Sequence, residues 1–278
     1  MKNRTDSKNI RQAVSEGAAR RFLSLSAGRV ATGRTLIVLP VFNEEECLPH
    51  VIHELGVVGA SLSASEVDVC FIDDGSTDRS REILEREMPG RFTFHAENTG
   101  VSGVIQTAAN IALSAGYAYV VQCDADGQHP LAAIPMLLAH AKENGQDLTI
   151  GSRFFRRGEG DPRAMRTTTR FRRVGARMIS WWISVLFGGF RVTDPTSGFR
   201  VYSAAALRSL VNAMPDKYPE PASIGVVIKA RLRIGEVGVD MRPRIAGQSN
   251  LAGWWNAVTY MWLAMKSLLR VRLGREIR

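Results

Sequence analysis

Two aspartates separated by one residue, Asp124 and Asp126, carry the strongest chemical signal in the chain. They follow the hydrophobic run from Tyr117 to Cys123, and residues i and i+2 of an extended strand end point the same way. Both carboxylates can therefore face one cation, and Gln128 can add a further oxygen. Oxygen ligands suit Mg²⁺ or Mn²⁺, which few protein groups and substrate phosphates commonly hold together. Such an ion neutralises charge as a sugar–phosphate bond breaks.

Two further hydrophobic runs also end in polar and acidic residues. The first is followed by Phe42-Asn-Glu-Glu45 and the second by Asp73-Asp-Gly-Ser-Thr-Asp78. Asp73 or Asp74 can accept hydrogen bonds from a nucleobase or a ribose; the alternative is that one of them caps the next helix. A lone D-x-D is weak evidence, but three acidic strand ends together predict one binding rim.

The elements that must position these residues alternate between strand and helix. Apolar and β-branched runs predict strands over residues 35–41, 67–73, 117–123 and 147–151. Helical spacing of apolar residues recurs over residues 48–55, 83–88 and 101–112, and we expect Ser76 or Thr77 to cap the middle helix. The alternation predicts an α/β fold with a Rossmann-like, mostly parallel sheet flanked by helices. Ligands bind such sheets at the carboxyl ends of the strands.

Motifs of other α/β enzymes are missing from the sequence. The first strand is followed by Val41-Phe-Asn-Glu-Glu-Glu46 rather than by the G-x-G-x-x-G of a dinucleotide dehydrogenase, and the chain has neither a P-loop nor G-x-S-x-G. The 278 residues suffice for one sizeable core. Three cysteines without C-x-x-C spacing fit buried residues in a reducing compartment. We find no signal-peptide pattern, and no apolar run is long enough to span a membrane.

The net charge of +9 is concentrated in three segments. Residues 1–34 hold eight Lys/Arg and two acidic residues, residues 153–177 hold nine Arg and two acidic residues, and residues 266–278 hold five Lys/Arg and one. The pattern suits anionic lipid headgroups and phosphorylated substrates, although a solvated basic tail is the alternative for residues 1–34. Within that tail a weak helix is expected from Asn9 to Ser26, with much of the rest disordered. Nucleic acid is not expected, because no zinc-finger spacing or RNP pattern is present.

Two segments combine arginines or lysines with an apolar stretch. In the first, Arg166, Arg170, Arg172, Arg173 and Arg177 precede Met178 to Phe187. Guanidinium groups bind phosphate bidentately, so Arg170 is a candidate for an acceptor phosphate, while an ordinary buried helix is the alternative. In the second, apolar residues recur at near-helical spacing before Lys266, Arg270 and Arg272: Leu251, Trp254, Trp255, Val258, Trp262, Met265 and Leu269. This is typical of an interfacial helix, but a core or dimer helix, or a small membrane-protein partner on this face, would also explain it.

The motifs, in order, resemble those of family-2 glycosyltransferases with the GT-A fold. They are LIVLPVFNEEECL, CFIDDGSTD, NTG (98–100), VVQCDADGQHP, GSRF (151–154), DPTSGFRVYS (194–203) and MRPRIAGQSN (241–250). Within the family the chain is most similar to the polyprenyl-phosphate sugar synthases, the dolichol-phosphate mannose synthase kind. The resemblance covers about residues 35–250.

The resemblance implies a role for each matching residue. The nucleotide would be lined by Pro40, Phe42, Glu44, Ile72 and Asp74. Asp124, Ala125 and Asp126, with Gln128, would hold the diphosphate and the metal. Arg153 would face the acceptor phosphate, and Arg244 would reach the donor phosphates. Catalysis would therefore depend on Asp124, Asp126 and Arg153.

The chain departs from the family pattern at three places. Phe42 stands where the family often has Tyr, which removes a hydroxyl but keeps the ring. Asn250 stands where a Lys is common, which puts donor-phosphate contact there in doubt. The stretch Asn98 to Gly103 lacks the usual Lys or Arg.

The sequence favours a phosphate rather than a hydroxyl as the acceptor. A hydroxyl needs a base to take its proton, and relatives that use one carry a Glu-Asp pair before the final helix. Tyr218 to Gly225 contains no such pair, although Glu220 or Asp194 could serve as a base. A phosphate monoester has its second pKa near ~6 and needs no base at neutral pH.

Taken together, the sequence predicts three parts: a basic tail (1–34), a GT-A domain (35–250) and an amphipathic membrane-surface helix (251–278). The predicted activity is inverting transfer of a hexose from a nucleotide-diphospho-sugar to a polyprenyl phosphate. The enzyme is expected in the cytoplasm, peripheral at the inner face of the cell membrane. One alternative is a family-2 enzyme acting on a hydroxyl of a glycan or small acceptor, and another is a non-catalytic nucleotide-sugar-binding scaffold.

Overall fold

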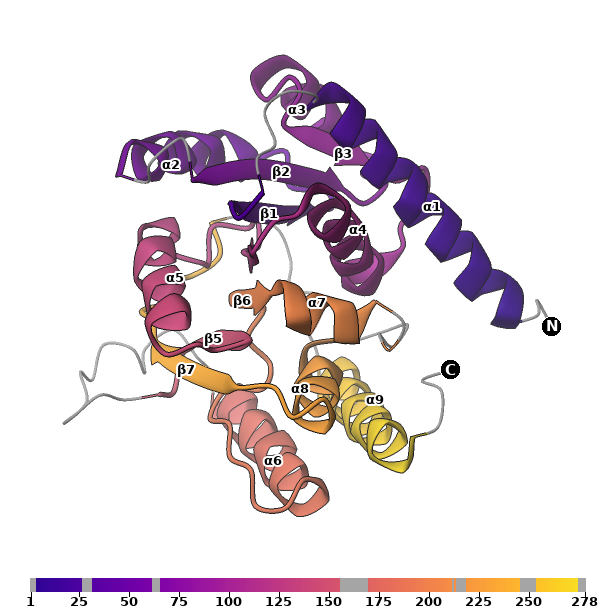
Figure 1. The fold of residues 1–278 in the computed structure, drawn as a ribbon, viewed down its shortest axis with the longest axis vertical. Helices are drawn as coiled ribbons and strands as arrows, with labels where there is room; N and C mark the ends of the chain where they lie inside the picture. Colours follow the sequence, from indigo (N-terminus) through magenta and orange to yellow (C-terminus); the bar gives the residue numbers. More distant parts are fainter. Residues whose placement is uncertain are drawn as a thin grey trace.

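The computed structural model describes residues 4–26, 32–61, 66–155, 170–211, 213, 219–245 and 254–274. Within these residues seven strands form one sheet in the order β3-β2-β1-β4-β6-β5-β7 (Figure 1). The strands are β1 (Thr35–Val41), β2 (Val67–Asp73), β3 (Phe92–Phe94), β4 (Tyr119–Gln122), β5 (Leu148–Ser152), β6 (Arg200–Ser203) and β7 (Ile234–Gly238). Only β6 runs antiparallel to its two neighbours among these strands. The expected α/β, mostly parallel sheet is confirmed.

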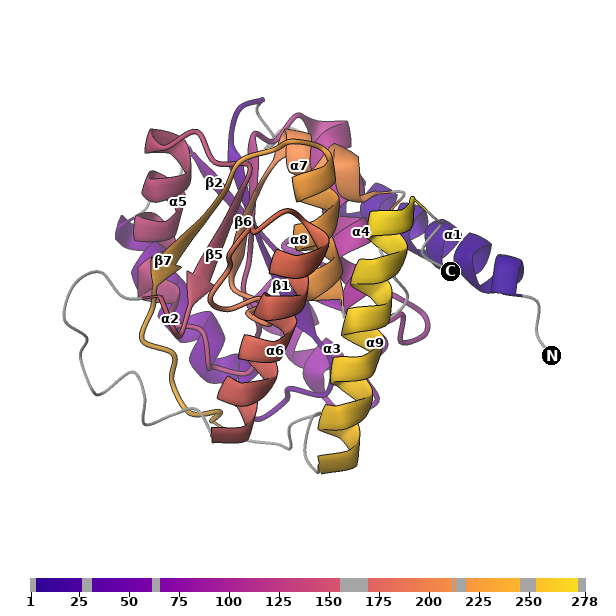
Figure 2. The same ribbon diagram turned by 90° about the horizontal axis from the view of Figure 1, so that it is seen from below.

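Helices cover both faces of the sheet (Figures 1 and 2). They are α1 (Arg4–Leu25), α2 (Leu48–Ser61), α3 (Ser80–Glu87), α4 (Gly100–Ala115), the short η1 (Leu131–Ala133), α5 (Ile134–Glu143), α6 (Arg170–Leu186), α7 (Ala204–Leu210), α8 (Pro219–Lys229) and α9 (Trp254–Leu273). The alternation of side chains along β1 explains the two layers. Leu36 and Val38 pack with α1, α4 and α6 to α9, whereas Ile37 and Leu39 pack with α2, α3 and α5.

The weak helix expected from Asn9 to Ser26 is present, and it begins earlier in the chain, among residues for which disorder was expected. Residues 4–25 form a continuous helix that packs on α4 and β3. Ala18, Ala19 and Phe22 are buried, and the last two belong to the main core. The inner face of α1 uses small residues, so the apolar stripe that would have revealed it is short.

The helix after β2 is not capped as expected. It begins at Ser80, with Arg79 as its N-terminal flanking residue, so Ser76 and Thr77 lie outside it. The Ser80 amide instead donates to Asp78 Oδ1 over 2.9 Å. Ser76 Oγ accepts from the Asn43 amide over 3.0 Å, which ties this loop to the end of β1.

The C-terminal helix α9 is not a free surface helix, because one of its faces is packed in the core of the protein. Tyr260, Ala264, Leu268 and Val271 are buried in the main core against α8 and α6. Gly225 of α8 permits this approach, since a Cβ there would lie 2.9 Å from Phe187 and 3.3 Å from Leu268. Trp262 and Leu269, from the predicted apolar stripe, point outward, and the side chains of Trp254 and Trp255 lie outside the described residues. No helix of the described part is both long and apolar enough to cross a bilayer.

Candidate active site

The carboxyl ends of β1, β2 and β4 meet at one rim, because these three strands are parallel neighbours. Asp124 and Asp126 follow β4 directly, and the Asp126 Oδ1 atom accepts the Gln128 amide over 3.0 Å. Phe42 follows β1 with its ring exposed. The rim thus combines a pair of carboxylates with an exposed aromatic face, which are the groups a nucleotide diphosphate needs.

Arg244 reaches the same rim because its segment lies over the loop after β4. The Arg242 amide donates to the Gln128 carbonyl over 2.9 Å, and the Ile245 amide donates to the Asp126 carbonyl over 3.4 Å. These backbone bonds place the Arg244 guanidinium in an ion pair with Glu44 and 3.7 Å from Asp126 Oδ2. Glu44, Asp126 and Arg244, predicted separately, therefore form one cluster.

His129 fixes the backbone at the first aspartate. Its Nδ1 accepts the Asp124 amide over 2.8 Å, and its ring stacks on Phe199 with centroids 5.0 Å apart. Burial lowers the pKa of His129 to about 4, so the ring is neutral at physiological pH with its proton on Nε2. The Nε2 atom lies 3.7 Å from Asp124 Oδ2. The sequence contained His129 within DGQHP, but we assigned it no role.

The carboxylates of the rim hold their protons more tightly than free side chains do. Burial raises the pKa of Asp124 to about 6, against the opposing effect of Arg244, Arg153 and Arg200. Burial, and then the neighbouring Asp124, raise the pKa of Asp126, and burial raises that of Glu44. A cation at the rim would favour the ionised form of these carboxylates, since an opposite charge nearby lowers a carboxyl pKa.

The donor set fits a divalent ion that also takes substrate oxygens. Asp124 and Asp126 offer carboxylates from one loop, with Gln128 beside them. No group of three or more His, Cys, Asp or Glu side chains among the described residues is arranged to hold a metal alone. Mg²⁺ commonly keeps one or two carboxylates and completes its shell with phosphates and water. The arrangement therefore suits an ion that arrives with a diphosphate.

Asp74 is buried beneath the rim and already has several partners. Its Oδ1 accepts from the Thr99 amide over 2.8 Å and lies 2.7 Å from His95 Nδ1, while its Oδ2 accepts from the Gly100 amide over 2.7 Å. Its neighbour Asp73 accepts from Arg81 Nε over 2.8 Å. Asp74 thus binds the amides at the start of α4. The capping alternative had placed it at the start of the helix directly after β2, which is α3.

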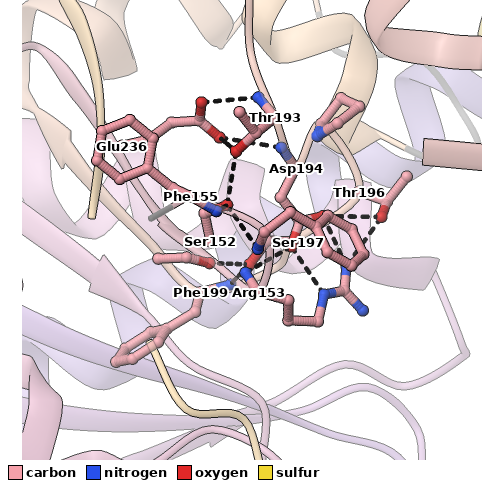
Figure 3. Close-up of polar contacts among 12 residues, drawn as sticks. Ser152, Arg153, Phe155, Thr193, Asp194, Thr196, Ser197, Phe199 and Glu236 are labelled. Carbon is pink, nitrogen blue, oxygen red and sulfur yellow. Dashed lines mark hydrogen bonds and ion pairs between the residues drawn. The ribbon is translucent and has the colours of Figure 1, made fainter. Parts of the chain in front are cut away.

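The third part of the site is a buried ion pair between Arg153, after β5, and Asp194 (Figure 3). Arg153 Nε donates to Asp194 Oδ2 over 2.7 Å and Nη2 to Oδ1 over 2.8 Å, and Nη2 also donates to Thr196 Oγ1. The Asp194 side chain is fully buried. Burial alone would raise the pKa of Asp194, but the Arg153 guanidinium and its hydrogen bonds hold it below its usual range.

Glu236 of β7 supports the loop that carries Asp194. Its carboxylate accepts from the Thr193 amide over 2.7 Å, from the Thr193 hydroxyl over 2.9 Å and from the Asp194 amide over 2.9 Å (Figure 3). The Thr193 hydroxyl also lies 2.9 Å from Ser152 Oγ, next to Arg153 in the chain. Strands β5 and β7 therefore hold both halves of the ion pair.

Comparison with known proteins decides the family. The sequence model described as Glycosyl transferase family 2 matches residues 36–211, well over half of the chain. The chain belongs to glycosyl transferase family 2.

The relatives of this family-2 glycosyltransferase include enzymes that act on polyprenyl phosphates. It is 30% identical over 230 residues to the undecaprenyl-phosphate mannosyltransferase of Micrococcus luteus, covering 79% of this chain and 88% of that one. It is 28% identical over 221 residues to the UDP-N-acetylglucosamine–dolichyl-phosphate N-acetylglucosaminyltransferase of Methanococcus voltae, covering 73% and 83%. The resemblance to the polyprenyl-phosphate sugar synthases is confirmed.

A solved structure with the same fold belongs to glucosyl-3-phosphoglycerate synthase of Mycobacterium tuberculosis. In its complex with Mn²⁺, uridine diphosphate and phosphoglyceric acid it aligns with a TM-score of 0.63 at 18% identity, covering 92% of this chain and 83% of that one. At this identity the likeness establishes the GT-A-like fold and nothing more.

The structure brings most of the predicted site residues of this glycosyltransferase to one region. Pro40 lies in the last two residues of β1 and Phe42 follows the strand with its ring exposed, whereas the side chains of Ile72 and Ala125 are buried. Whether Ile72, Ala125 and Asp74 contact a nucleotide stays a prediction. The Arg170 side chain lies outside the described residues, so its assignment to the acceptor phosphate also stays a prediction.

Arg172 is a residue that the sequence reasoning did not select. It lies in the first turn of α6, and burial together with the nearby Arg153 lowers its pKa, while Asp126 and Asp194 oppose the change. It therefore lies within electrostatic reach of both halves of the site. The sequence placed Arg172 in the basic run before Met178 but assigned the acceptor phosphate to Arg170.

Proposed function

We propose that this glycosyltransferase moves a hexose from a nucleotide-diphospho-sugar to a polyprenyl phosphate, with inversion at the anomeric carbon. The observation that carries the proposal is that Arg153 lies within electrostatic reach of Asp124, and Arg172 within electrostatic reach of Asp126. Cations for an acceptor phosphate then lie next to a site for the donor diphosphate. The relatives' acceptors support the same choice.

Different residues would contact different parts of the donor. Phe42 offers its exposed ring to the base, and Arg244 lies beside Glu44 and Asp126 to meet the donor phosphates. Mg²⁺ or Mn²⁺, held by Asp124 and Asp126 with Gln128, would neutralise the diphosphate as it leaves. His129 holds the backbone of Asp124 by accepting its amide.

The acceptor phosphate needs orientation rather than deprotonation. Arg153, whose guanidinium group is held in place by Asp194, would face the acceptor phosphate at the end of β5. Arg172 would add a second positive charge. A phosphate oxygen attacks the anomeric carbon from the face opposite the diphosphate. The new carbon–oxygen bond forms as the bond to the nucleoside diphosphate breaks, and no proton has to be removed at neutral pH.

A donor and acceptor panel tests this proposal. The purified chain would receive Mn²⁺ or Mg²⁺, several nucleotide sugars, and undecaprenyl or dolichyl phosphate in detergent. We expect nucleoside diphosphate release that requires both the metal and the lipid phosphate, together with a glycosylated lipid. Release with a sugar alcohol in place of the lipid would move the assignment to a hydroxyl acceptor. No release with any donor would contradict transferase activity altogether.

A hydroxyl acceptor is the second candidate, and the two possible bases bear on it. Asp194 is paired with Arg153, and its lowered pKa makes it a weak base. Burial raises the pKa of Glu220, at the start of α8, against the effect of Arg200. Glu220 is thus the carboxylate that this alternative would need, and Glu220→Gln would abolish turnover only if a hydroxyl is the acceptor.

The outer faces of α6 and α9 support work at a lipid surface. Apolar side chains are exposed at helical spacing on both helices: Val174, Met178, Trp181 and Val185 on α6, and Trp262, Leu269 and Leu273 on α9. The helices lie side by side (Figure 2), with Trp182 Nε1 donating to the Met265 carbonyl over 3.0 Å. Lys266, Arg270 and Arg272 flank the apolar side chains, so we infer an anionic bilayer as the partner of this face.

Replacing Trp181 or Trp262 by glutamate should weaken binding to vesicles of mixed neutral and anionic phospholipid about tenfold or more each. The reason is that each change removes a large apolar side chain from the bilayer and adds a charge of the wrong sign. Co-sedimentation over a lipid titration measures it. Val57→Glu is the control, because Val57 is equally exposed on α2, in the opposite layer. Equal losses for all three variants would contradict the assignment of this face.

We place the enzyme peripherally on the cytoplasmic side of the membrane. The three cysteines are free and buried, which fits a reducing compartment. Nothing in the relatives supports the further expectation of a small membrane-protein partner, and we do not propose one.

A further inference from the structure

Helix α1 is built into the edge of the fold, although it precedes residues 36–211, where the family model matches. It crosses α4 and β3 at the edge of the sheet (Figure 1). The Thr93 hydroxyl of β3 donates to the Ala18 carbonyl over 2.8 Å, and the Arg21 guanidinium lies 3.7 Å from the centre of the Phe94 ring. Two contacts to β3 thus set the position of α1 against the sheet.

A second set of contacts leads from α1 toward the donor rim. Ser15 Oγ accepts from Asn110 Nδ2 over 3.1 Å and lies 3.0 Å from Thr107 Oγ1. Thr107 Oγ1 is 2.8 Å from His95 Nε2, and His95 Nδ1 is 2.7 Å from Asp74 Oδ1. The Thr107 hydroxyl donates to Ser15 Oγ, and the His95 ring lies within hydrogen-bond distance of both Thr107 and Asp74. All five groups are thus linked by consecutive hydrogen-bonding contacts.

The hydrogen-bonded series from Ser15 to Asp74 is shielded from water along its length. Ser15 and Thr107 have no exposed surface, His95 is 1% exposed and Asp74 is 4% exposed. In such surroundings a hydrogen bond contributes more than at the surface, and a buried polar group that loses its partner pays the full cost of its lost hydration. A change at Ser15 is therefore felt by Thr107 and His95 rather than absorbed by solvent.

Asp74, the last group of this hydrogen-bonded series, holds two loops of the rim. Asp74 binds the amides of Thr99 and Gly100, and its own amide donates to the Val41 carbonyl over 2.8 Å. The neighbouring Gly75, with φ of +74°, packs so closely that a Cβ would lie 2.8 Å from the Asn98 nitrogen. The end of β1, the loop after β2 and the start of α4 consequently move as a unit with Asp74.

We propose that Ser15 is a positioning residue for the donor nucleotide, acting through Thr107 and His95 on Asp74 and the loop 98–100. The inference rests on the proposed function in one respect, namely that the rim around Phe42 and Asp74 receives the nucleotide. Helix α1 then sets the shape of the donor site without touching the donor.

Variants at two links of the chain test the proposal. Ser15→Ala removes the first hydroxyl. Thr107→Val removes the second at nearly constant volume, and Thr107→Ser restores it. Thr93→Val is the matched control, because it removes a buried hydrogen bond to α1 that does not lead to Asp74. Amide hydrogen exchange of residues 97–103 in the full chain reads the loop directly, and calorimetric titration with UDP and GDP in Mn²⁺ reads the donor site.

Ser15→Ala and Thr107→Val should speed exchange at residues 99–103 and weaken the better-bound nucleoside diphosphate about threefold to tenfold, as expected for one lost buried hydrogen bond. Thr107→Ser and Thr93→Val should bind within about twofold of the wild type. With saturating donor, kcat should stay near the wild-type value, so that the loss appears in KM for the donor.

Unchanged exchange at residues 99–103 in both hydroxyl-deleting variants would overturn the inference, and so would faster exchange with unchanged nucleotide affinity. Equal effects of Thr93→Val and Ser15→Ala would reduce α1 to a general stabilising element. A wild-type chain that binds neither UDP nor GDP would instead contradict the proposed function. The two failures are therefore distinguishable.

Discussion

Replacing Asp126 by asparagine should lower turnover about a hundredfold to a thousandfold while leaving the fold intact. The amide oxygen of asparagine can still accept the Gln128 amide, which Asp126 Oδ1 accepts over 3.0 Å, so the loop keeps its geometry. The change removes one negative charge from a site whose carboxylates already have raised pKa values. A group that stabilises charge in the transition state is worth about this factor in rate.

The measurement is kcat over a titration of Mn²⁺ with the best donor from the panel. Saturating metal should rescue the variant only in part. Asp240→Ala is the control, because Asp240 is an exposed carboxylate on the segment after β7. Turnover of Asp126→Asn above about one tenth of the wild-type value would contradict the assignment of Asp126 to the diphosphate and the metal.

Replacing Asp194 by asparagine should destabilise the folded chain by about 3–5 kcal/mol, the usual cost of leaving a buried charge without its partner. Arg153 would keep its charge in a site where only 17% of its side chain is exposed. For a chain of this size the unfolding temperature should fall by about 10 °C. Urea unfolding followed by circular dichroism measures the free energy.

A double variant separates charge from packing. In Arg153→Met/Asp194→Asn the unpaired cation is gone, so part of the lost stability should return. If the double variant were as unstable as Asp194→Asn, or if that single variant lost less than about 1 kcal/mol, the ion pair would not be the element that holds this loop.

The pH dependence gives an independent readout of the same pair. Asp194 has a folded-state pKa below its ordinary value, so its stabilising contribution is present at neutral pH and is lost as the pH falls below about 4. The wild type should therefore lose stability in this range more steeply than Asp194→Asn, which carries no such group. Parallel curves would contradict the assignment.

The sequence was informative where both faces of an element are apolar. The run 35–41 predicts β1 to the residue, because a central parallel strand needs apolar side chains toward both layers. Helix α1 was predicted from Asn9 to Ser26 and is observed from Arg4 to Leu25. Its signal is weak because its buried face consists of Ser15, Ala18, Ala19 and Phe22, and small or polar residues give little periodic signal.

The site was predictable only where its residues are close in the chain. Asp124, Asp126 and Gln128 lie on one loop, and their spacing after a hydrophobic strand, together with the other acidic strand ends, indicated a cation site. Arg153 and Asp194 are 41 residues apart, and the pairing of β6 and β7 with β5 brings them together in the folded sheet. The role of His129 was not predictable, because it depends on the direction in which its ring points in the folded structure.

The packing of α9 has a consequence for how the enzyme selects its acceptor. Its inner face shares a core with α8, and Lys229 Nζ of α8 donates to the Val271 carbonyl over 2.9 Å. Close-packed interiors transmit displacement rather than absorb it, so the outer face of α9 keeps a fixed distance and tilt relative to the rim. If this face rests on a bilayer as proposed, a lipid phosphate in that bilayer would approach Arg153 from one direction and at one height. Selection among phosphorylated acceptors then becomes partly a matter of where each molecule's phosphate rests in space.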